Sequence, residues 1–420
     1  MKEKNRTISV FEHWSSSVPV KIGYLYIDHS KGTDLFSFEY DEEFLRTRKF
    51  NFILDPDLEF YPGRQFVYHK PNFGIFSDSA PDRWGRVLMN RREAMEARKE
   101  ERKPRKLTDA DCLLGVFDET RMGALRFSED DGNTFLSNDA SAAAPPWTTL
   151  RSLEEASRRF EAEEDPFNDA WLNQLLKPGS SLGGARPKAN VQATDGSLWI
   201  AKFPSKNDEH NTGAWEKAAH DLAGLCGLRV PPSKLETFSK AGSTFLIKRF
   251  DREGSRRVHF SSAMTMLGKT DGASASDGSS YLEIAEFIRS NGSQPKVDLL
   301  ELWKRIVFNM AISNTDDHLR NHGFLLTNKG WTLSPLYDVN PIPYGDTLSL
   351  NVTSDSNLID LSLAIETASY YGLSLPEAKD EAVKICRVVR DNWEKLAARY
   401  GVSRGGIELM RPAFTACYDQ

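Results

Sequence analysis

The first part of the chain alternates short apolar runs with turn residues. Segments such as "KIGYLYID" (21–28) and "QFVYHK" (65–70) are short runs of apolar and aromatic residues. Such runs between turn residues are typical of strands in an antiparallel sheet. The segment 73–103 then changes to a charged, helical pattern in its second half. The beginning of the chain therefore predicts a β-rich region followed by a helix.

A second pattern begins near residue 177. Residues 177–205 predict a glycine-rich loop, a strand, an Asp-Gly turn and another strand, and residues 243–251 predict a further strand. Between them, residues 214–228 have the pattern of an amphipathic helix. Beyond residue 251 the pattern is mostly helical, as in 298–314. The second half thus predicts an α+β fold with a small sheet lobe and a larger helical lobe.

The polar segment 128–147 ends in two prolines and gives the strongest internal boundary signal. We therefore expect three regions. Residues 1–150 form a β-rich subdomain, residues 151–250 hold the glycine-rich loop and its sheet, and residues 251–420 form the helical lobe.

Composition narrows the class of protein. The 420 residues are 40% hydrophobic and 27% charged, which is ordinary for a globular protein. The formal net charge of -6 disfavours non-specific nucleic-acid binding by the whole surface. The four cysteines form no CxxC pair, so we expect buried thiols rather than a zinc finger or a disulfide framework. The chain has neither a signal-peptide core nor an apolar run of about 18 residues, which predicts a cytoplasmic protein with no membrane segment.

Candidate chemistry first gathers in the glycine-rich loop "SSLGGARPK" (180–188). Gly183 and Gly184 allow a tight turn and offer backbone NH groups to phosphate oxygens, and Lys188 adds positive charge. The spacing is not that of a Walker A motif. A plain hairpin loop would explain the same residues equally well.

A lysine inside an apolar strand is the second signal. Lys202 in "LWIAKFP" resembles the strand lysine of protein kinases, which pairs with nucleotide phosphates. In those kinases a glutamate on the following helix holds the lysine, and Glu216 is the candidate for that role. An exposed helix glutamate is the alternative interpretation.

The densest cluster of polar groups is "NTDDHLRNHGF" (314–324). Asp316 and Asn321 have the D-x-x-x-x-N spacing of kinase catalytic loops, where the aspartate receives the substrate hydroxyl proton and the asparagine binds magnesium. A hairpin pattern follows and leads to Asp338, a candidate for the other magnesium ligand, although no Phe-Gly follows it. Lys202, Asp316, Asn321 and Asp338 thus occur in the order that phosphoryl transfer requires.

Two other interpretations compete for this stretch. Its two aspartates and two histidines could form a transition-metal site, but no second His/Asp cluster of matching spacing occurs elsewhere. Helix capping would explain the residues before Asp316 but not the later Asp338. Under the kinase interpretation Asp317 faces away from Asp316 and is either structural or a support for a neighbouring site residue. His318 contacts nucleotide phosphate or braces the loop, and His322 is a satisfied surface histidine.

Together these segments resemble the HipA family of bacterial toxin serine/threonine kinases, the partners of HipB-type antitoxins. The resemblance covers nearly the whole chain, and residues 73–91 and 113–127 are similar to the family's N-terminal subdomain. The segments that resemble its kinase core are "SSLGGARPKANV", "LWIAKFPS", "KRFDR", "NTDDHLRNHGF" and "LSPLYDV". The resemblance implies a bilobal protein-kinase-like fold, with a β-rich N-terminal lobe and an all-helical C-terminal lobe.

The resemblance also implies roles for individual residues. Asp316 corresponds to the catalytic aspartate, and Asn321 and Asp338 correspond to the magnesium ligands. Ser181 corresponds to the serine whose autophosphorylation ejects the loop and inactivates family kinases, with Ser180 as a neighbouring alternative. The residues implied to bind ATP are Gly183, Gly184, Ala185, Arg186, Pro187, Lys188, Lys202, Lys248, Arg249, Phe250, His318, Tyr337 and Asp338.

The function that follows from this resemblance is ATP- and magnesium-dependent phosphorylation of a protein serine or threonine by the toxin of a type II toxin–antitoxin module. The implied partners are a HipB-type helix-turn-helix antitoxin, operator DNA reached through that antitoxin, and a protein substrate such as an aminoacyl-tRNA synthetase. Two rival functions stay open: a pseudokinase that acts only as antitoxin partner and corepressor, and an atypical kinase for lipids or small molecules.

Overall fold

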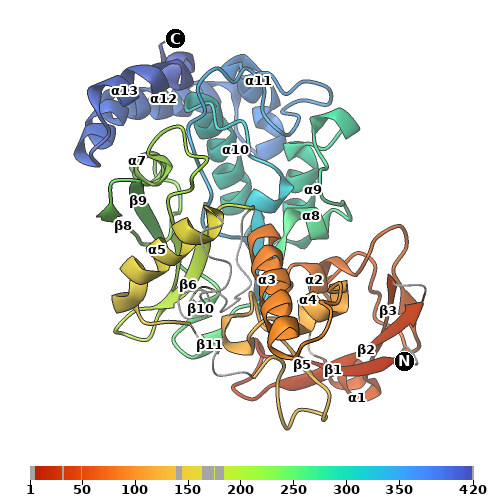
Figure 1. Ribbon diagram of the computed structural model, residues 1–420. Helices are drawn as coiled ribbons and strands as arrows, with labels where there is room; N and C mark the ends of the chain where they lie inside the picture. Colours follow the sequence, from red (N-terminus) through yellow and green to blue (C-terminus); the bar gives the residue numbers. More distant parts are fainter. Residues whose placement is uncertain are drawn as a thin grey trace. The chain divides into compact units, whose positions relative to one another are not determined.

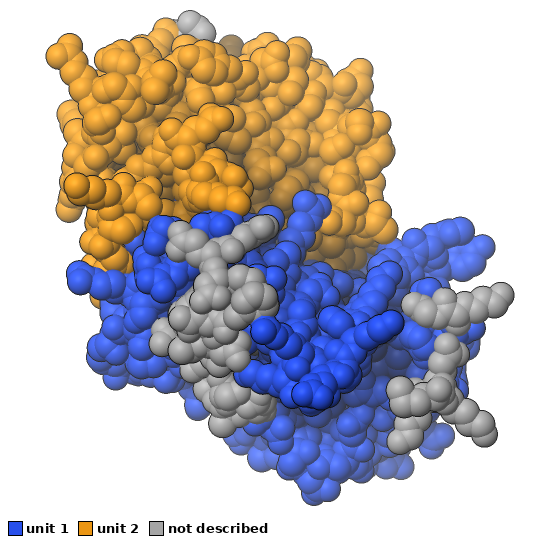
Figure 2. Space-filling view, in the orientation of Figure 1, with its two compact units in different colours: residues 1–201, 249–261 blue, residues 202–248, 262–420 orange. Residues whose placement is uncertain are grey.

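The computed structural model describes residues 5–30, 33–48, 50–138, 144–162, 175 and 184–418. The chain divides into two compact units (Figure 2). Unit 1 comprises residues 1–201 and 249–261, and unit 2 comprises residues 202–248 and 262–420. The segment 128–147, expected as an internal boundary, falls within the range of unit 1. In the described part of the chain, no helix is long and apolar enough to cross a membrane.

Unit 1 begins with an antiparallel sheet in the order β4-β3-β2-β1-β5 (Figure 1). In β2 the buried Leu25 and Ile27 alternate with the partly exposed Tyr24 and Tyr26. In β1, by contrast, every residue from Ile8 to Glu12 is buried. Gly23 is required where β2 meets β3, because a Cβ there would lie 2.2 Å from the carbonyl oxygen of Glu39. The strands are β1 (Arg6–Glu12), β2 (Val20–Ser30), β3 (Thr33–Tyr40), β4 (Gln65–Phe66) and β5 (Leu125–Ser128).

The remaining elements of unit 1 are mostly helical. The charged helix predicted after residue 73 is α3, and its apolar side packs Trp84, Leu88 and Met95 against Ala156 of α5. The helices are α1 (Glu42–Thr47), α2 (Gly74–Ser77), α3 (Arg83–Lys99), α4 (Asp109–Gly115), η1 (Asp118–Thr120), η3 (Trp147–Thr149) and α5 (Leu150–Glu161). The further strands are β6 (Lys188–Gln192), β7 (Leu198–Lys202), β10 (Arg252–Glu253), β11 (Arg256–Arg257) and β12 (Phe260–Ser262); the last residues of β7 and β12 belong to unit 2.

Unit 2 starts with the antiparallel pair β8 (Ser233–Ser239) and β9 (Gly242–Lys248), against which α7 (Thr212–Leu225) packs. The helix and the strand predicted in this region are therefore both confirmed. All four cysteines of the chain are buried free thiols, as expected from the absence of a CxxC pair.

The rest of unit 2 is mainly helical and is centred on α10, whose residues from Leu302 to Ala311 are almost entirely buried. A helix that is apolar on nearly all sides belongs in the core of a helical lobe. The helices are α8 (Ala263–Met266), η4 (Ala275–Asp277), α9 (Tyr281–Asn291), α10 (Pro295–Ala311), η5 (Leu319–Asn321), α11 (Leu361–Glu366), η6 (Thr367–Tyr371), α12 (Leu375–Arg399), α13 (Arg404–Met410) and η7 (Arg411–Cys417).

One hairpin interrupts these helices. Strands β13 (Gly323–Thr327) and β14 (Gly330–Leu333) pair antiparallel, with Thr327 opposite Gly330 at the turn. Gly330 has a positive φ of 122°, which suits glycine and closes the two-residue turn. The hairpin predicted before Asp338 is confirmed. Residues 251–420 were expected to be all-helical, but they also contain the strands β10 to β14.

Candidate functional site

Lys202, at the end of β7, forms the central ion pairs of unit 2. Its Nζ lies 2.5 Å from Oε1 of Glu216 and 2.6 Å from Oδ1 of Asp338. Burial alone would lower the pKa of Lys202, but the two carboxylates outweigh this effect and raise that pKa above its ordinary value. The lysine is therefore a charged group that is held in place from two sides.

Glu216 reaches Lys202 because α7 begins at a defined point. The side chain of Asn211 caps the helix by accepting a hydrogen bond from the amide of Ala214. Gly213 allows close approach to β9, since a Cβ there would lie 2.0 Å from the carbonyl oxygen of Ser243. Glu216 is only 2% exposed. The predicted Lys202–Glu216 pair is thus formed, and the interpretation of Glu216 as an exposed helix residue is wrong.

The polar stretch 314–324 follows the end of α10. Ser313 takes a positive φ of 47° there, and the amide of Asn314 donates to the carbonyl oxygen of Asn309 at 2.8 Å. This geometry ends the helix and turns the chain into a loop that continues through η5 to Asn321. The apolar core helix therefore delivers the polar loop at a fixed position in unit 2.

Asp316 is exposed on this loop, whereas His318 is partly buried. Desolvation by the surrounding protein raises the pKa of Asp316 above its usual range, His318 opposes the shift, and Asp338 and Asp317 add to it. Asp316 and Asp338 therefore influence each other electrostatically. The Nδ1 atom of His318 is buried and has no hydrogen-bond partner within the described residues. It could therefore donate a hydrogen bond to an acceptor atom of a ligand.

Asn321 and Asp338 provide oxygen atoms beside this loop. The Nδ2 group of Asn321 donates to the carbonyl oxygen of Asp316 at 2.8 Å, which leaves its amide oxygen as the potential ligand atom. Asp338 has a positive φ of 57°, a conformation that is uncommon outside glycine and that concentrates at functional sites. One carboxylate and one carboxamide suit magnesium, which usually completes its shell with water and phosphate oxygens. Among the described residues, no three His, Cys, Asp or Glu side chains come together as a metal site.

Asp317 and His322 face the interior of unit 2. Asp317 is 1% exposed, and its Oδ2 lies 2.8 Å from Nε2 of His322. The expectation that Asp317 faces away from Asp316 is confirmed by this burial. The expectation of a surface position for His322 is wrong, because the residue is fully buried where the loop enters β13 and pairs with Asp317.

Tyr337 and Lys248, also implied to bind ATP, form hydrogen bonds to backbone carbonyl groups of unit 2. The hydroxyl of Tyr337 donates to the carbonyl oxygen of Arg320 at 2.6 Å and so ties the segment before Asp338 to the polar loop. The backbone amide of Lys248 donates to the carbonyl oxygen of Pro232 at 2.9 Å, and its side chain is partly exposed.

The described part of the glycine-rich loop, residues 184–188, belongs to unit 1. Gly184 and Ala185 are exposed, Arg186 is partly buried, and Pro187 is buried. Lys188 is only 3% exposed, and its Nζ donates to Asp82 Oδ2 at 2.8 Å and to the carbonyl oxygen of Gly184 at 2.9 Å. Its charge is therefore neutralised within unit 1. Ser180, Ser181 and Gly183 lie outside the described residues.

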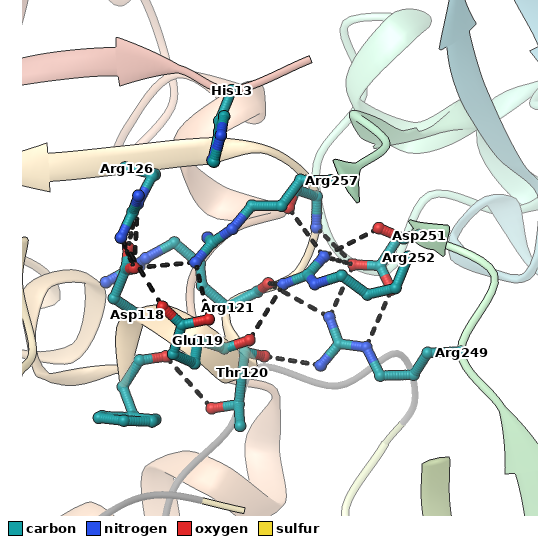
Figure 3. Close-up of polar contacts among 12 residues, drawn as sticks. His13, Asp118, Glu119, Thr120, Arg121, Arg126, Arg249, Asp251, Arg252 and Arg257 are labelled. Carbon is teal, nitrogen blue, oxygen red and sulfur yellow. Dashed lines mark hydrogen bonds and ion pairs between the residues drawn. The ribbon is translucent and has the colours of Figure 1, made fainter. Parts of the chain in front are cut away.

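Arg249 and Phe250, which the resemblance implied to bind ATP, also belong to unit 1. Arg249 is 4% exposed, and its guanidinium donates to both carboxylate oxygens of Asp251, at 2.9 and 2.7 Å, and to the carbonyl oxygen of Thr120 at 2.7 Å. Figure 3 shows this guanidinium turned toward Asp251. Any contact of Arg249 with a nucleotide would thus have to come from its backbone. The ring of Phe250 is partly buried, and its centroid lies 6.1 Å from the centroid of the Phe260 ring.

Sequence reasoning missed Tyr281 and Asn309, which both contact Asp317. Tyr281 lies 36 positions away from Asp317, and nothing in its local pattern marks it. Asn309 did carry a signal, since it is a carboxamide inside the apolar run of α10. A polar residue at such a position needs a buried partner.

A model of the family described as HipA-like C-terminal domain matches residues 180–396. The match covers the polar loop, the hairpin and all the described unit 2 residues of the site. Two relatives of Sinorhizobium fredii, named "Putative kinase Y4mE" and "Putative kinase Y4dM", are 26% and 29% identical over 57% and 60% of this chain. The matched part spans 54% and 61% of those proteins, so the chain matches less than two thirds of the length of either relative.

A solved structure supports the fold. HipA from Shewanella oneidensis MR-1, determined in a toxin–antitoxin complex with HipB and operator DNA, aligns with a TM-score of 0.63 at 16% identity. The alignment covers 98% of this chain and 96% of that HipA chain. The predicted α+β, kinase-like fold class is therefore confirmed.

Proposed function

Because the chain belongs to the HipA-like C-terminal domain family, we propose that it is an ATP- and magnesium-dependent serine/threonine protein kinase that acts as a toxin of a toxin–antitoxin module. The observation that carries this proposal is the double ion pair of Lys202 with Glu216 and Asp338. A buried lysine held between two carboxylates is a preorganised cation for nucleotide phosphates.

In the proposed reaction, each group of unit 2 has a separate task. Asp316 orients the substrate hydroxyl and receives its proton, and Lys202 neutralises phosphate charge. Asn321 and Asp338 would hold magnesium, which supplies charge neutralisation at the transferred phosphate when it is bound. His318 would donate from its buried ring nitrogen to a phosphate oxygen. Positioning and charge neutralisation account for most of the catalysis in phosphoryl transfer, and the proposed site would supply groups for both.

The partners belong to the same proposal. The Shewanella oneidensis chain was solved with HipB and operator DNA, and the fold likeness supports a HipB-type helix-turn-helix antitoxin as partner, with operator DNA reached through it. A protein substrate such as an aminoacyl-tRNA synthetase is an expectation from the resemblance alone. The buried free thiols fit a reducing cytoplasm.

We also propose autophosphorylation at Ser181 as the off-switch. A phosphate of about -2 charge beside bound ATP would repel the triphosphate and favour departure of the loop. Mass spectrometry of the chain after incubation with ATP should find phosphate at Ser181, and none in Ser181→Ala. A phosphate that persists in this variant would move the site to Ser180 or elsewhere.

The kinase proposal is tested with the full chain and radiolabelled ATP. Label should enter the chain itself and a protein of a bacterial lysate, only with magnesium present. Asp316→Ala should lower transfer below about a hundredth of wild type while MgATP still binds, because the hydroxyl loses its orienting carboxylate. No transfer by wild type without antitoxin would favour the pseudokinase. Label in a lipid extract but in no protein would favour the lipid kinase.

A further inference from the structure

Three side chains from separate parts of unit 2 converge on one carboxylate oxygen. Oδ2 of Asp317 accepts hydrogen bonds from the hydroxyl of Tyr281 at 2.7 Å and from Nδ2 of Asn309 at 2.7 Å, and it lies 2.8 Å from Nε2 of His322. All four residues are at most 1% exposed. We call these four residues the Asp317 hub.

Each donor of the hub is itself held in place. Tyr281 is the first residue of α9, directly after the capping box that Ser280 forms. Asn309 sits in the core helix α10, and its Oδ1 accepts from Nδ2 of Asn314 at 3.0 Å. The carbonyl oxygen of His322 accepts from the amide of Ala263 at 2.8 Å, at the start of α8. The hub therefore joins the polar loop to α8, α9 and α10.

We propose that Asp317 is a positioning residue for the phosphotransfer reaction, which fixes the loop between Asn314 and His322 so that Asp316 and Asn321 face the reacting phosphate. This inference rests on the proposed kinase function. The hydrogen bonds of the Asp317 side chain go to Tyr281, Asn309 and His322, and not to the groups assigned to substrate or metal. It acts through the backbone, because Asp316 is its immediate neighbour and Asn321 is followed directly by His322.

The chemistry of the hub suits this task. A hydroxyl and an amide can bond a carboxylate only at short range and in narrow directions, whereas a charged partner also attracts from a distance. Tyr281 on α9, Asn309 on α10 and His322 after η5 all bond to this one oxygen. The loop can satisfy these three buried groups together in only one position. Displacement of a catalytic group by about 1 Å can cost about a hundredfold in rate, so a loop carrying Asp316 needs this precision.

A purely structural role would predict a different result, namely loss of stability without a selective loss of rate. Asp298 gives a matched control in the same unit. It is a fully buried carboxylate on α10 that accepts from Arg229 at 2.6 Å, from the Thr332 hydroxyl at 2.9 Å and from the Leu333 amide at 3.0 Å. Its contacts reach β14 and not the polar loop.

The experiment compares Asp317→Ala, Asp317→Asn and Tyr281→Phe with Asp298→Asn in the full chain. Autophosphorylation with radiolabelled ATP gives the rate, calorimetry gives MgATP affinity, and hydrogen exchange follows the peptide covering 313–322. Asp317→Ala should lose about a hundredfold in rate, with MgATP affinity within about threefold of wild type and faster exchange in that peptide. Asp317→Asn, which keeps one acceptor oxygen, should recover part of the rate.

If Asp317→Ala does not fold, Tyr281→Phe tests whether the Asp317 hub positions the loop. It keeps the ring and removes one donor, so the rate should fall about fivefold to tenfold at unchanged MgATP affinity. Asp298→Asn should leave both the rate per folded molecule and the exchange of 313–322 unchanged. The proposal is overturned by a wild-type rate in folded Asp317 and Tyr281 variants, by an equal loss of rate in Asp298→Asn, or by a loss of MgATP affinity that matches the loss of rate.

Failure of the kinase function itself would be visible separately. If the wild-type chain transfers no phosphate, the proposed function is wrong, and exchange of the 313–322 peptide then judges the hub alone. Faster exchange in Asp317→Ala and Tyr281→Phe, but not in Asp298→Asn, would support the positioning of the loop. Unchanged exchange would overturn it.

Discussion

Units 1 and 2 hold buried carboxylates in two different ways. In unit 1, Asp118 and Asp251 are surrounded by arginines, as Figure 3 shows. In unit 2, Oδ2 of Asp317 is held by a hydroxyl, an amide and an imidazole. The first arrangement surrounds each carboxylate with guanidinium groups, and the second combines two neutral donors with one imidazole.

The arginine cluster of unit 1 joins two distant segments of the chain. Asp251 accepts from Arg249, from Arg252 at 2.7 Å and from the backbone amide of Gly123 at 2.8 Å. Asp118 accepts from Arg126 and from Arg257 at 2.8 Å. Burial would raise the pKa of both carboxyls, but the arginines outweigh it and lower both pKa values. The cluster thus fastens residues 249–257 to residues 118–126.

Arg121 shows the limit of this charge pairing. Its guanidinium is fully buried and donates to the carbonyl oxygens of Ser79, Leu113, Val116 and Leu136. Burial lowers the pKa of Arg121 to about 9, which still leaves it charged at neutral pH. Unit 1 therefore buries more arginines than the two aspartates can neutralise, and removal of either aspartate would leave cations uncompensated.

The difference teaches where strength and where precision are needed. Charge pairs in a desolvated cluster are strongly coupled, so loss of one member is costly. Neutral donors contribute less energy per bond but define direction closely. On this basis the cluster of unit 1 serves as a fastening, and the hub of unit 2 serves as a positioning device for a loop.

The largest expected effect comes from Asp251→Asn. The side chain keeps its shape but loses the charge opposite Arg249 and Arg252, which should cost about 3–5 kcal/mol of unfolding free energy. Urea unfolding gives the total, and hydrogen exchange of peptides 118–126 and 249–257 locates the loss. A cost below about 1 kcal/mol would show that the cluster is not held by charge, and the comparison would then fail.

The same isosteric change in unit 2 should cost less. Asp317→Asn keeps an acceptor for the hydroxyl and amide donors, so the loss should be about 1–2 kcal/mol, the difference between charged and neutral hydrogen bonds. Urea unfolding of the two variants side by side makes the comparison direct. A cost in Asp317→Asn equal to that in Asp251→Asn would mean that the two regions are held in the same way.

Acid should weaken both regions by the same physical route. The pKa values of Asp251 and Asp317 are lowered by their partners, so each carboxylate stabilises the fold above the ordinary aspartate pKa of about 3.9. That stabilisation is lost as pH falls from about 5 through the lowered values. Unfolding at a series of pH values should show a shallower acid decline in Asp251→Asn and Asp317→Asn than in wild type. Parallel curves would contradict the assigned pKa directions.

The smallest effect is expected for Glu119→Ala. The side chain of Glu119 is 68% exposed, and its oxygens lie 3.8 Å from Arg126 and 3.7 Å from Arg257. Exposed pairs of this kind contribute about 0–1 kcal/mol because solvent screens them. An unfolding free energy within about 0.5 kcal/mol of wild type would sharpen the contrast with Asp251, and a loss of several kcal/mol would extend the buried cluster to Glu119.

Local pattern was enough to predict much of the fold and of the candidate site. The strands around residues 21–28 and 243–251 and the hairpin before Asp338 follow from short apolar runs and from turn residues. Lys202 stood out in the sequence because apolar strand residues flank it, and in the structure it forms ion pairs with Glu216 and Asp338. Such features depend on residues that are close in sequence, and for that reason pattern alone can reveal them.

Other assignments needed partners that are distant in sequence. Lys188 stands beside glycines and suggested a phosphate contact, but its ammonium pairs with Asp82, 106 positions away. His322 had the pattern of a surface residue, but it is buried against Asp317 in a hub that Tyr281 completes. No local pattern can specify such pairs, because they form only when the folded chain brings the two segments together.

The sequence by itself determined which chemical groups the polar loop carries and in what order Lys202, Asp316, Asn321 and Asp338 occur. Only the tertiary structure decided that Asp317 and His322 face inward while Asp316 remains exposed. The physical reason is desolvation, since a buried charge must find donors or counter-charges wherever the fold provides them. In "NTDDHLRNHGF", the spacing to Asn321 separated the two adjacent aspartates in role, and the fold gave them opposite environments.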